Sequence, residues 1–287
     1  MRKDQFESPD YYMVEKLFSE EQILVRDATR QWVKEYVSPI IEDCNLKGVF
    51  PKELIKGIAE IGGFGAILPA KYGGSELDLI SYGLMMQELE RGDSSIRVMC
   101  SIQTSLVMNN IYEHGNDFHK QEFLLKLSKG ELIGSFGLSE PGHGSDPASM
   151  QTRHAIDGDY YIINGSKMWI GNAPFCDIAL VWSKAADNRY SCFIIHRDDP
   201  GFSTSKIDKK WSFRASETGE LIFDNCKVHK KYLLYESDSI QSALSSLNIA
   251  RYAVACGSIG IAMECYDVAL KYSNERIQFG KKISSNQ

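Results

Sequence analysis

The chain has 287 residues, which allows two or three small domains, and its hydrophobic content of 43% is sufficient for a folded core. A formal net charge of -6 argues against a surface for nucleic acid or anionic membranes. The seven cysteines form no C-x-x-C pair and the six histidines show no metal-ligand spacing, which indicates a reduced protein without disulfides or metal. Neither a signal or transit peptide nor a stretch of membrane-spanning length is recognised. A cytoplasmic location is therefore expected, with a mature mitochondrial form as the alternative.

Residues 1–130 are predicted to form an all-helical domain. Ser19-Glu-Glu-Gln22 is a capping box that opens the first helix, which should end before Pro39. Pro51 and Gly62-Gly63 frame a second helix. Three further helices are expected at about 80–91, 94–112 and 117–127.

Residues 131–237 are predicted to form an antiparallel β-barrel or sandwich. Two strand-like runs, 160–163 and 167–170, flank Asn164-Gly165, which predicts a hairpin with a tight turn. Helical pattern returns in 238–287, where small residues recur within a long helix over 243–271 and require neighbouring helices. This region reads as the start of a helical bundle, so the fold class is α+β. Other strands are expected at 178–182, 192–196 and 221–223.

A glycine-rich segment, Ser135–Pro147, lies where the helical pattern changes to the strand pattern. Gly142 and Gly144 flank His143. Glycine has no Cβ, so its backbone can approach a ligand closely and present N–H groups to it. No helix opens after the last glycine, which excludes a Rossmann fingerprint. Taken alone, the segment is more typical of a tight surface turn, and only its position in the chain favours a ligand-binding role.

Four sequence words, in this order of domains, make the chain resemble the acyl-CoA dehydrogenases along almost its whole length. Within that family, Glu-Arg-Gly-Asp-Ser-Ser-Ile-Arg (90–97) followed by Ser101 is most similar to the glutaryl-CoA dehydrogenases. The four words are Leu-Ser-Glu-Pro-Gly-His-Gly-Ser-Asp (138–146), Lys-Met-Trp-Ile-Gly-Asn (167–172), Leu-Asn-Ile-Ala-Arg-Tyr (247–252) and Arg-Ile-Gln-Phe-Gly (276–280).

The resemblance implies an FAD enzyme. Ser139 and nearby backbone groups would bond the pyrimidine end of the flavin, and Trp169 to Gly171 would flank its reactive side. Ordinary strand packing is the alternative for Trp169. Many family members carry Thr where this chain has Gly171, so one hydroxyl contact is lost or replaced. Arg276 and Gln287 match residues that reach the FAD of a neighbouring subunit. The implied cofactor contacts are Phe136, Leu138, Ser139, Gly144, Ser145, Trp169, Ile170, Gly171, Arg276, Phe279 and Gln287.

Arg97 and Ser101 lie four residues apart, on one face of a predicted helix. An inward Arg is costly unless it is paired, and a charge-assisted bond to a carboxylate contributes roughly 1.5–3 kcal/mol. A solvated Arg near a helix start is the alternative. In glutaryl-CoA dehydrogenases the matching pair binds the distal carboxylate, so the resemblance implies glutaryl-CoA as substrate. The implied substrate contacts are Arg97, Ser101, Ser145, Leu247, Asn248 and Arg251.

The resemblance also implies oxidative decarboxylation to crotonyl-CoA, as in lysine and tryptophan degradation, electron transfer to an electron-transfer flavoprotein, and a homotetramer. The family's catalytic base is a Glu, expected beyond residue 287 in most members; a minority place it at the position of Ala250, which cannot take a proton. No catalytic residue is therefore assigned. Two alternatives stay open: a truncated or pseudoenzyme form that binds flavin and acyl-CoA without turnover, and a dehydrogenase of short monocarboxylic acyl-CoA.

Overall fold

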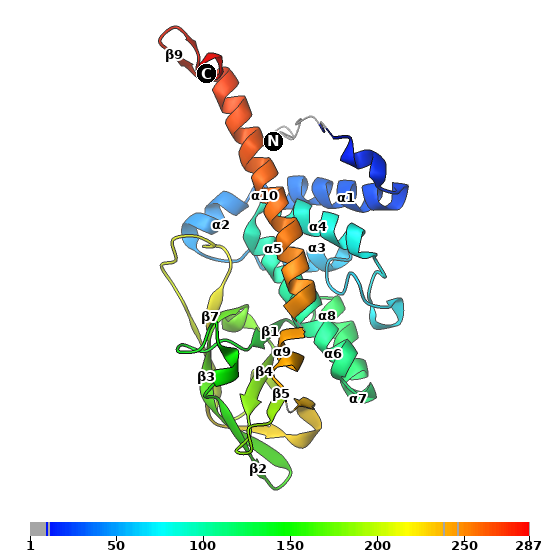
Figure 1. Cartoon of the computed structure of the whole chain (residues 1–287), viewed down its shortest axis with the longest axis vertical. Helices are drawn as coiled ribbons and strands as arrows, with labels where there is room; N and C mark the ends of the chain where they lie inside the picture. The colour runs from blue at the N-terminus through cyan, green and yellow to red at the C-terminus, as the bar shows by residue number, and fades with distance from the viewer. Residues whose placement is uncertain (1–9, 11, 238, 246, 287) are drawn as a thin grey trace.

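The computed structural model describes residues 10, 12–237, 239–245 and 247–286. A helical layer from the first part of the chain packs beside a mixed sheet formed within residues 134–237 (Figure 1). The last long helix lies along the helical layer and projects beyond it. This architecture confirms the α+β fold class.

The first helix begins and ends where the sequence indicates. Ser19 caps α1 (Glu20–Trp32): its hydroxyl accepts from the backbone N–H of Gln22, whose side chain accepts from the N–H of Ser19. A π-helical segment, Val33–Val37, extends the helix to just before Pro39. The capping box is confirmed.

Two aspartates start the helices that reach the functional site. Asp78 caps α4 (Leu79–Gly92) and Asp93 caps α5 (Ser94–Ser101), each accepting a backbone N–H of the first turn. The helix begun by α5 continues through a π-helical segment, Ile102–Met108. The other helices are α2 (Ile41–Lys47), α3 (Leu54–Glu60), α6 (Asn109–His114), α7 (Asp117–His119), α8 (Leu125–Ser128), α9 (Gln241–Ser245) and α10 (Leu247–Glu275), with a π-helical link Lys120–Leu124 between α7 and α8.

Eight strands form one sheet in the order β6-β7-β3-β2-β4-β5-β8, with β1 paired to β4. Most neighbours are antiparallel, but β1 and β2 run parallel to β4. The expectation of a purely antiparallel domain is wrong here, because β1 enters the sheet directly from the helical layer before the hairpins begin. The strands are β1 (Gly134–Gly137), β2 (Arg153–Asp157), β3 (Tyr160–Gly171), β4 (Ile178–Lys184), β5 (Tyr190–His196), β6 (Phe202–Lys206), β7 (Thr218–His229) and β8 (Leu233–Ser237), and a separate pair is β9 (Ile277–Gln278) with β10 (Lys281–Lys282).

The predicted hairpin at Asn164-Gly165 is wrong. These residues lie inside β3, at a register shift against β7 between Ile163 and Gly165. The turn into β3 is at Gly158 instead, where φ is 57°. Gly165 has a φ of 137°, and a Cβ there would lie 2.7 Å from Thr152, so the glycine serves a bulge and not a turn.

Both faces of the sheet are buried at β4. Leu180 and Trp182 pack into the core that the helices share, whereas Ala179 and Val181 face a second core between the strands. All residues of β4 up to Ser183 are buried. The helical layer therefore rests directly on the sheet strand that carries β1.

Small residues on α10 allow it to lie close against α4. Ala253, Gly257 and Gly260 are buried on this face. A Cβ at Gly260 would lie 1.9 Å from the carbonyl oxygen of Gln87, so no larger residue fits without separating the helices. This contact sets the distance between α10 and α4.

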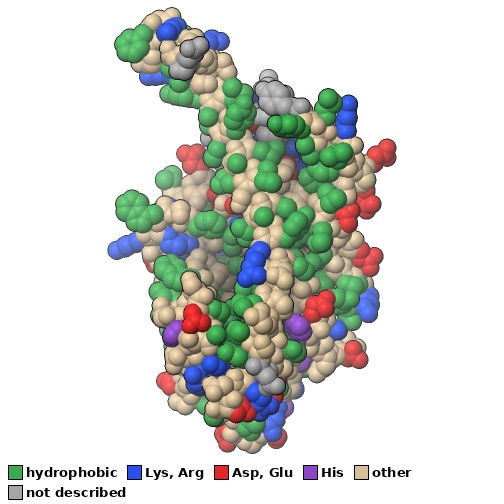
Figure 2. Space-filling view, viewed as in Figure 1, with side chains coloured by type: hydrophobic (Ala, Val, Ile, Leu, Met, Phe, Trp, Pro, Cys, Tyr) green, Lys and Arg blue, Asp and Glu red, His purple; other side chains and the backbone are tan. Residues whose placement is uncertain are grey.

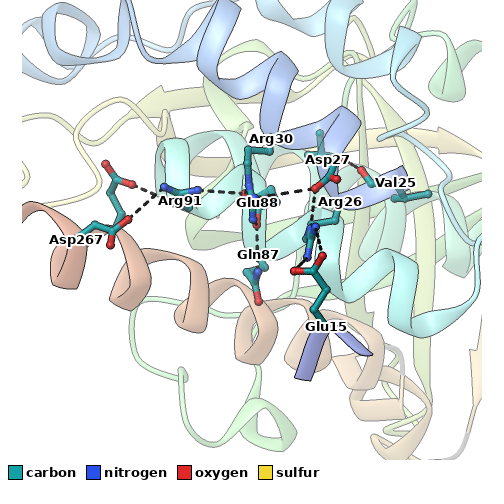
Figure 3. A network of polar contacts seen from close by, with 11 residues as sticks. Glu15, Val25, Arg26, Asp27, Arg30, Gln87, Glu88, Arg91 and Asp267 are labelled. Carbon is teal, nitrogen blue, oxygen red and sulfur yellow. Dashed lines mark hydrogen bonds and ion pairs between the residues drawn. The ribbon is translucent and has the colours of Figure 1, made fainter. Parts of the chain in front are cut away.

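A chain of ion pairs joins α1, α4 and α10 (Figure 3). Arg30 of α1 bonds Glu88 of α4 at 3.0 Å. Arg91, one turn further along α4, reaches two carboxylates of α10: Glu264 at 3.1 Å and Asp267 at 3.7 Å. The pairs orient α10 about its axis in addition to the small-residue contact.

Hydrophobic side chains are exposed along both flanks of α10 (Figure 2). By length and composition alone, the helix Gln241–Glu275 could cross a membrane, so the expectation that no stretch reaches that length is wrong. Core helices of globular proteins share these properties, and α10 packs along α4. The exposed apolar residues include Val254, Ile259, Ile261, Tyr266, Val268, Leu270 and Tyr272.

Candidate functional site

A small pocket of about 240 Å³ lies where β1, β3 and the helical layer meet. It brings together seven residues that the family resemblance assigned to flavin or substrate, and two that it did not. The lining residues are Ile102, Leu106, Phe136, Leu138, Ser139, Trp169, Ile170, Gly171 and Leu247.

The first wall of the pocket is the end of β1. Phe136 is held in the sheet opposite Leu180 of β4. The segment expected to be a loop from residue 135 is therefore a strand as far as Gly137, because its backbone pairs with β4. The loop begins at Leu138, which is buried, and Ser139 follows at the half-buried rim.

The second wall is a bulge near the end of β3. Lys167 pairs with Leu221 of β7, and the next paired residue, Ile170, lies opposite Gly219, so β3 carries one residue more than its partner strand. Trp169 has a φ of 64°, a strained value for a bulky residue, and its side chain is 60% exposed. The bulge thereby presents the indole at the rim of the pocket.

The third wall comes from the π-helical segment that follows α5. A Cβ at Gly171 would lie only 2.3 Å from Cδ1 of Ile102. Ile102 thus fills the space that a side chain at position 171 would need. Many family members carry Thr where this chain has Gly171, and here the side chain of Ile102 occupies the space across the pocket.

Arg97 and Ser101 lie on α5, immediately before this wall. Arg97 is only 5% exposed, forms an ion pair with Glu90 and donates from Nη1 to the hydroxyl of Ser101 at 3.2 Å. The alternative of a solvated Arg is excluded. The inference that an inward Arg needs a partner is correct, but the partner within this chain is Glu90, which sequence reasoning missed.

Gly257 of α10 covers this ion pair. A Cβ at Gly257 would lie 2.9 Å from Oε2 of Glu90 and 3.1 Å from Nε of Arg97. The close approach of α10 therefore excludes water from one side of the guanidinium.

Other residues assigned from the resemblance lie away from the pocket. Gly144 and Ser145 are exposed beyond its rim. Asn248 and Arg251 are exposed on α10, where Nη1 of Arg251 donates to Oδ1 of Asn248 at 3.0 Å. Two further assigned residues, Arg276 and Phe279, are exposed beyond the far end of α10, next to β9 (Figure 1), and Gln287 lies outside the described residues.

The pocket residues that sequence reasoning missed are Ile102 and Leu106. They lie four residues apart on one helical face, which was a usable signal. From the sequence alone, this spacing predicts ordinary core positions, because nothing in the local sequence shows that the bulge of β3 lies opposite them.

Three family models match consecutive parts of the chain: the N-terminal domain of acyl-CoA dehydrogenase over residues 19–131, the middle domain over 135–226 and the C-terminal domain over 240–287. Together with the fold and the pocket, these matches show that the chain belongs to the acyl-CoA dehydrogenase family.

Relatives of two substrate types are similar to the chain. It is 35% identical over 271 residues to the short/branched chain specific acyl-CoA dehydrogenase of Rattus norvegicus, covering 93% of this chain and 62% of that protein. It is 36% identical over 278 residues to the glutaryl-CoA dehydrogenase of Desulfococcus multivorans, covering 94% and 71%. A crystal structure of a glutaryl-CoA dehydrogenase from Mycobacterium smegmatis in complex with FADH2 matches with a TM-score of 0.93 at 36% identity, covering 96% and 71%. The chain thus spans 62% to 71% of the length of these proteins.

Acyl-CoA dehydrogenases are FAD-dependent, and solved relatives contain FADH2 or FAD. The pocket fits part of such a cofactor: Trp169 offers an exposed aromatic face, Phe136 and Ile170 are apolar, and the hydroxyl of Ser139 lies at the rim. Pockets that enclose a whole ligand usually have about 300–1,000 Å³. The present volume is smaller, so the pocket has room for part of such a cofactor and not for the whole of it.

Proposed function

We propose that this chain forms the flavin- and acyl-binding part of an FAD-dependent acyl-CoA dehydrogenase whose substrate is the dicarboxylic thioester glutaryl-CoA. The observation that carries the substrate class is Arg97, a buried guanidinium on the helix that continues into the pocket wall.

Arg97 retains the capacity to bind a carboxylate. A guanidinium has five N–H donors, and the hydrogen bonds to Glu90 and Ser101 use only some of them. An acyl chain with an apolar end would need only apolar lining and would leave the remaining N–H donors of Arg97 unused. A carboxylate at the end of the acyl chain would instead gain charge-assisted bonds.

When bound, FAD would supply the hydride acceptor for the oxidation of an acyl substrate. The protein's own residues would bind and orient the flavin and the substrate. Trp169 and Ile170 would exclude water, Ser139 would donate a hydrogen bond to the edge of the flavin ring, and Ile102 would pack against the acyl group. Arg97 holds the distal carboxylate. No proton acceptor is assigned, so the proposal covers binding and orientation. Oxidative decarboxylation to crotonyl-CoA, an electron-transfer flavoprotein as electron acceptor and a homotetramer are parts of the same proposal, taken from the family resemblance. A cytoplasmic location is proposed from the sequence expectation.

A monocarboxylic substrate is the competing proposal, supported by the 35% identity to the short/branched chain enzyme. The two proposals differ in what Arg97 does. If Arg97 only balances Glu90, it does not distinguish between acyl chains.

Arg97→Ala in the FAD-loaded protein tests the difference. We expect glutaryl-CoA to bind at least about tenfold more weakly to the variant, because a charge-assisted bond is lost, while butyryl-CoA binding changes little. Dissociation constants for both thioesters would be measured by calorimetric titration.

Arg26→Ala is the matched control. Arg26 is also a buried arginine in an ion pair, with Glu15 at 3.2 Å, but lies on α1 outside the pocket. Equal losses for the two thioesters in Arg97→Ala, or a selective loss in Arg26→Ala, would refute carboxylate binding by Arg97.

A further inference from the structure

A second buried ion pair lies directly behind the pocket, between Glu140 and Lys167. Lys167 is fully buried, and its Nζ lies 2.8 Å from Oε1 of Glu140 and 3.2 Å from the carbonyl oxygen of Leu138. Neither side chain lines the pocket. The pair is therefore not explained by contact with a ligand.

The pair joins the two walls that would meet a flavin. Glu140 follows Ser139 on the loop after β1, and Lys167 precedes Trp169 by two residues on the bulge of β3. The backbone of the same segments is joined as well, since the N–H of Met168 donates to the carbonyl oxygen of Ser139 at 2.9 Å. The ion pair thus fixes the loop with Ser139 relative to the bulge with Trp169.

Glu140 is anchored on its other side by a third segment. Its carboxylate accepts from the backbone N–H of Gln151 at 2.6 Å and from the N–H and hydroxyl of Thr152 at 2.9 and 2.6 Å. Although burial alone raises the pKa of Glu140, Lys167 and these donors lower it to about 2. Burial lowers the pKa of Lys167 to about 8, which Glu140 partly opposes. Both groups therefore carry their charges at neutral pH.

The backbone makes room for the lysine. A Cβ at Gly137 would lie 3.1 Å from Cγ of Lys167 and 3.0 Å from Leu221. The aliphatic stem of Lys167 consequently passes beneath the end of β1 to reach Glu140.

A gain in folding stability is a weak explanation for this ion pair, because apolar residues of similar size can often replace a buried ion pair without a loss of stability. The strain at Trp169 gives a more specific reason. A bulky residue with φ of 64° persists only where its surroundings enforce that conformation. Lys167, two residues before Trp169, is fully buried, and its ammonium group contacts Glu140 and the carbonyl oxygen of Leu138.

We propose that Lys167 and Glu140 are positioning residues: their ion pair holds the strained bulge so that Trp169 faces the flavin loop at Ser139. This inference rests on the proposed flavin site, but it concerns the geometry of Trp169 in the protein without cofactor and is testable there.

The test is a fluorine NMR spectrum of the chain labelled with 5-fluorotryptophan. Trp169→Phe identifies the Trp169 resonance among the four tryptophans. In Lys167→Met we expect this resonance to shift or broaden, while those of Trp32, Trp182 and Trp211 stay in place. Lys167→Met leaves Glu140 uncompensated and could unfold, so the double variant Lys167→Met/Glu140→Gln, which removes both charges, is measured beside it.

Arg30→Met/Glu88→Gln is the control, since it removes an ion pair at 3.0 Å between the half-buried Arg30 and the buried Glu88 in the helical layer. It should leave the Trp169 resonance unchanged. An unchanged Trp169 resonance in the folded Lys167 variants, or an equal change in the control, overturns the proposal.

A parallel FAD titration separates this inference from the proposed function. If the wild-type chain binds FAD, the double variant should bind it about tenfold more weakly. If wild type fails to bind FAD but Trp169 responds to the variants, the positioning role holds and the flavin proposal fails. Wild-type affinity in the double variant would count against the positioning role.

Discussion

At the scale of single residues, two buried charges show what a sequence reveals about a site. Arg97 is recognisable because it stands with Ser101 at helical spacing, and the structure confirms that it is buried and paired. Glu90 could not be identified as its partner, because the helix breaks at Asp93 between them. Lys167 reads as an ordinary alternating residue of a strand, since its partner Glu140 comes from another segment.

The lowered pKa of Glu140 has a consequence for acid stability. A carboxylate whose pKa falls from 4.5 to about 2 on folding stabilises the protein above the unfolded pKa and loses this contribution as the pH falls through the folded pKa. This difference in pKa corresponds to a contribution on the order of 3 kcal/mol to the free energy of unfolding. We expect wild type to be more stable than Glu140→Gln at pH 6, and the gap to narrow steadily between about pH 4.5 and 2. Urea unfolding across this pH range measures the difference in unfolding free energy between the two proteins. A difference that is independent of pH would contradict the lowered pKa of Glu140.

At the scale of secondary-structure elements, the sequence predicted the helices better than the strands. The capping box at Ser19 acts locally, so the start of the first helix could be inferred. Asp78 and Asp93 cap α4 and α5 by equally local hydrogen bonds. Both runs predicted as strands, 160–163 and 167–170, lie in β3, but their continuity could not be inferred, because the bulges at Gly165 and Trp169 are imposed by β7, a distant partner along the chain. Asn164-Gly165 therefore resembles a turn although it lies within a strand.

The close contact between β3 and the helical layer makes Gly171 sensitive to substitution. In Gly171→Ala, the new Cβ would lie 2.3 Å from Cδ1 of Ile102, so the isoleucine must move. We expect a loss of about 1–3 kcal/mol in the free energy of unfolding, which is typical of overpacking. Thermal or urea unfolding measures the loss.

Two variants control this prediction. Ile102→Val/Gly171→Ala removes the Cδ1 methyl group and should recover most of the lost stability. Gly142→Ala adds a methyl group where no atom lies within 4 Å and should have little effect. A Gly171→Ala protein as stable as wild type would show that Ile102 moves without cost.

At the scale of the whole molecule, α10 connects the two halves of the proposed site. Its small-residue face covers the Arg97–Glu90 pair through Gly257, and its first residue, Leu247, lines the pocket at β1 and β3. The sequence predicted the long helix and its small-residue seam, and these are confirmed. The sequence could not predict that the seam packs on α4, because the residues of neither helix identify the other as its packing partner.

The central claim is that the pocket at β1 and the bulge of β3 receives a flavin. Titrating FAD with the purified chain tests it most directly, because an indole against the ring quenches flavin fluorescence. We expect saturable quenching with wild type and a marked loss of quenching, with FAD still bound, in Trp169→Leu. Absence of saturable binding by wild type, or equal quenching by the two proteins, would contradict the account.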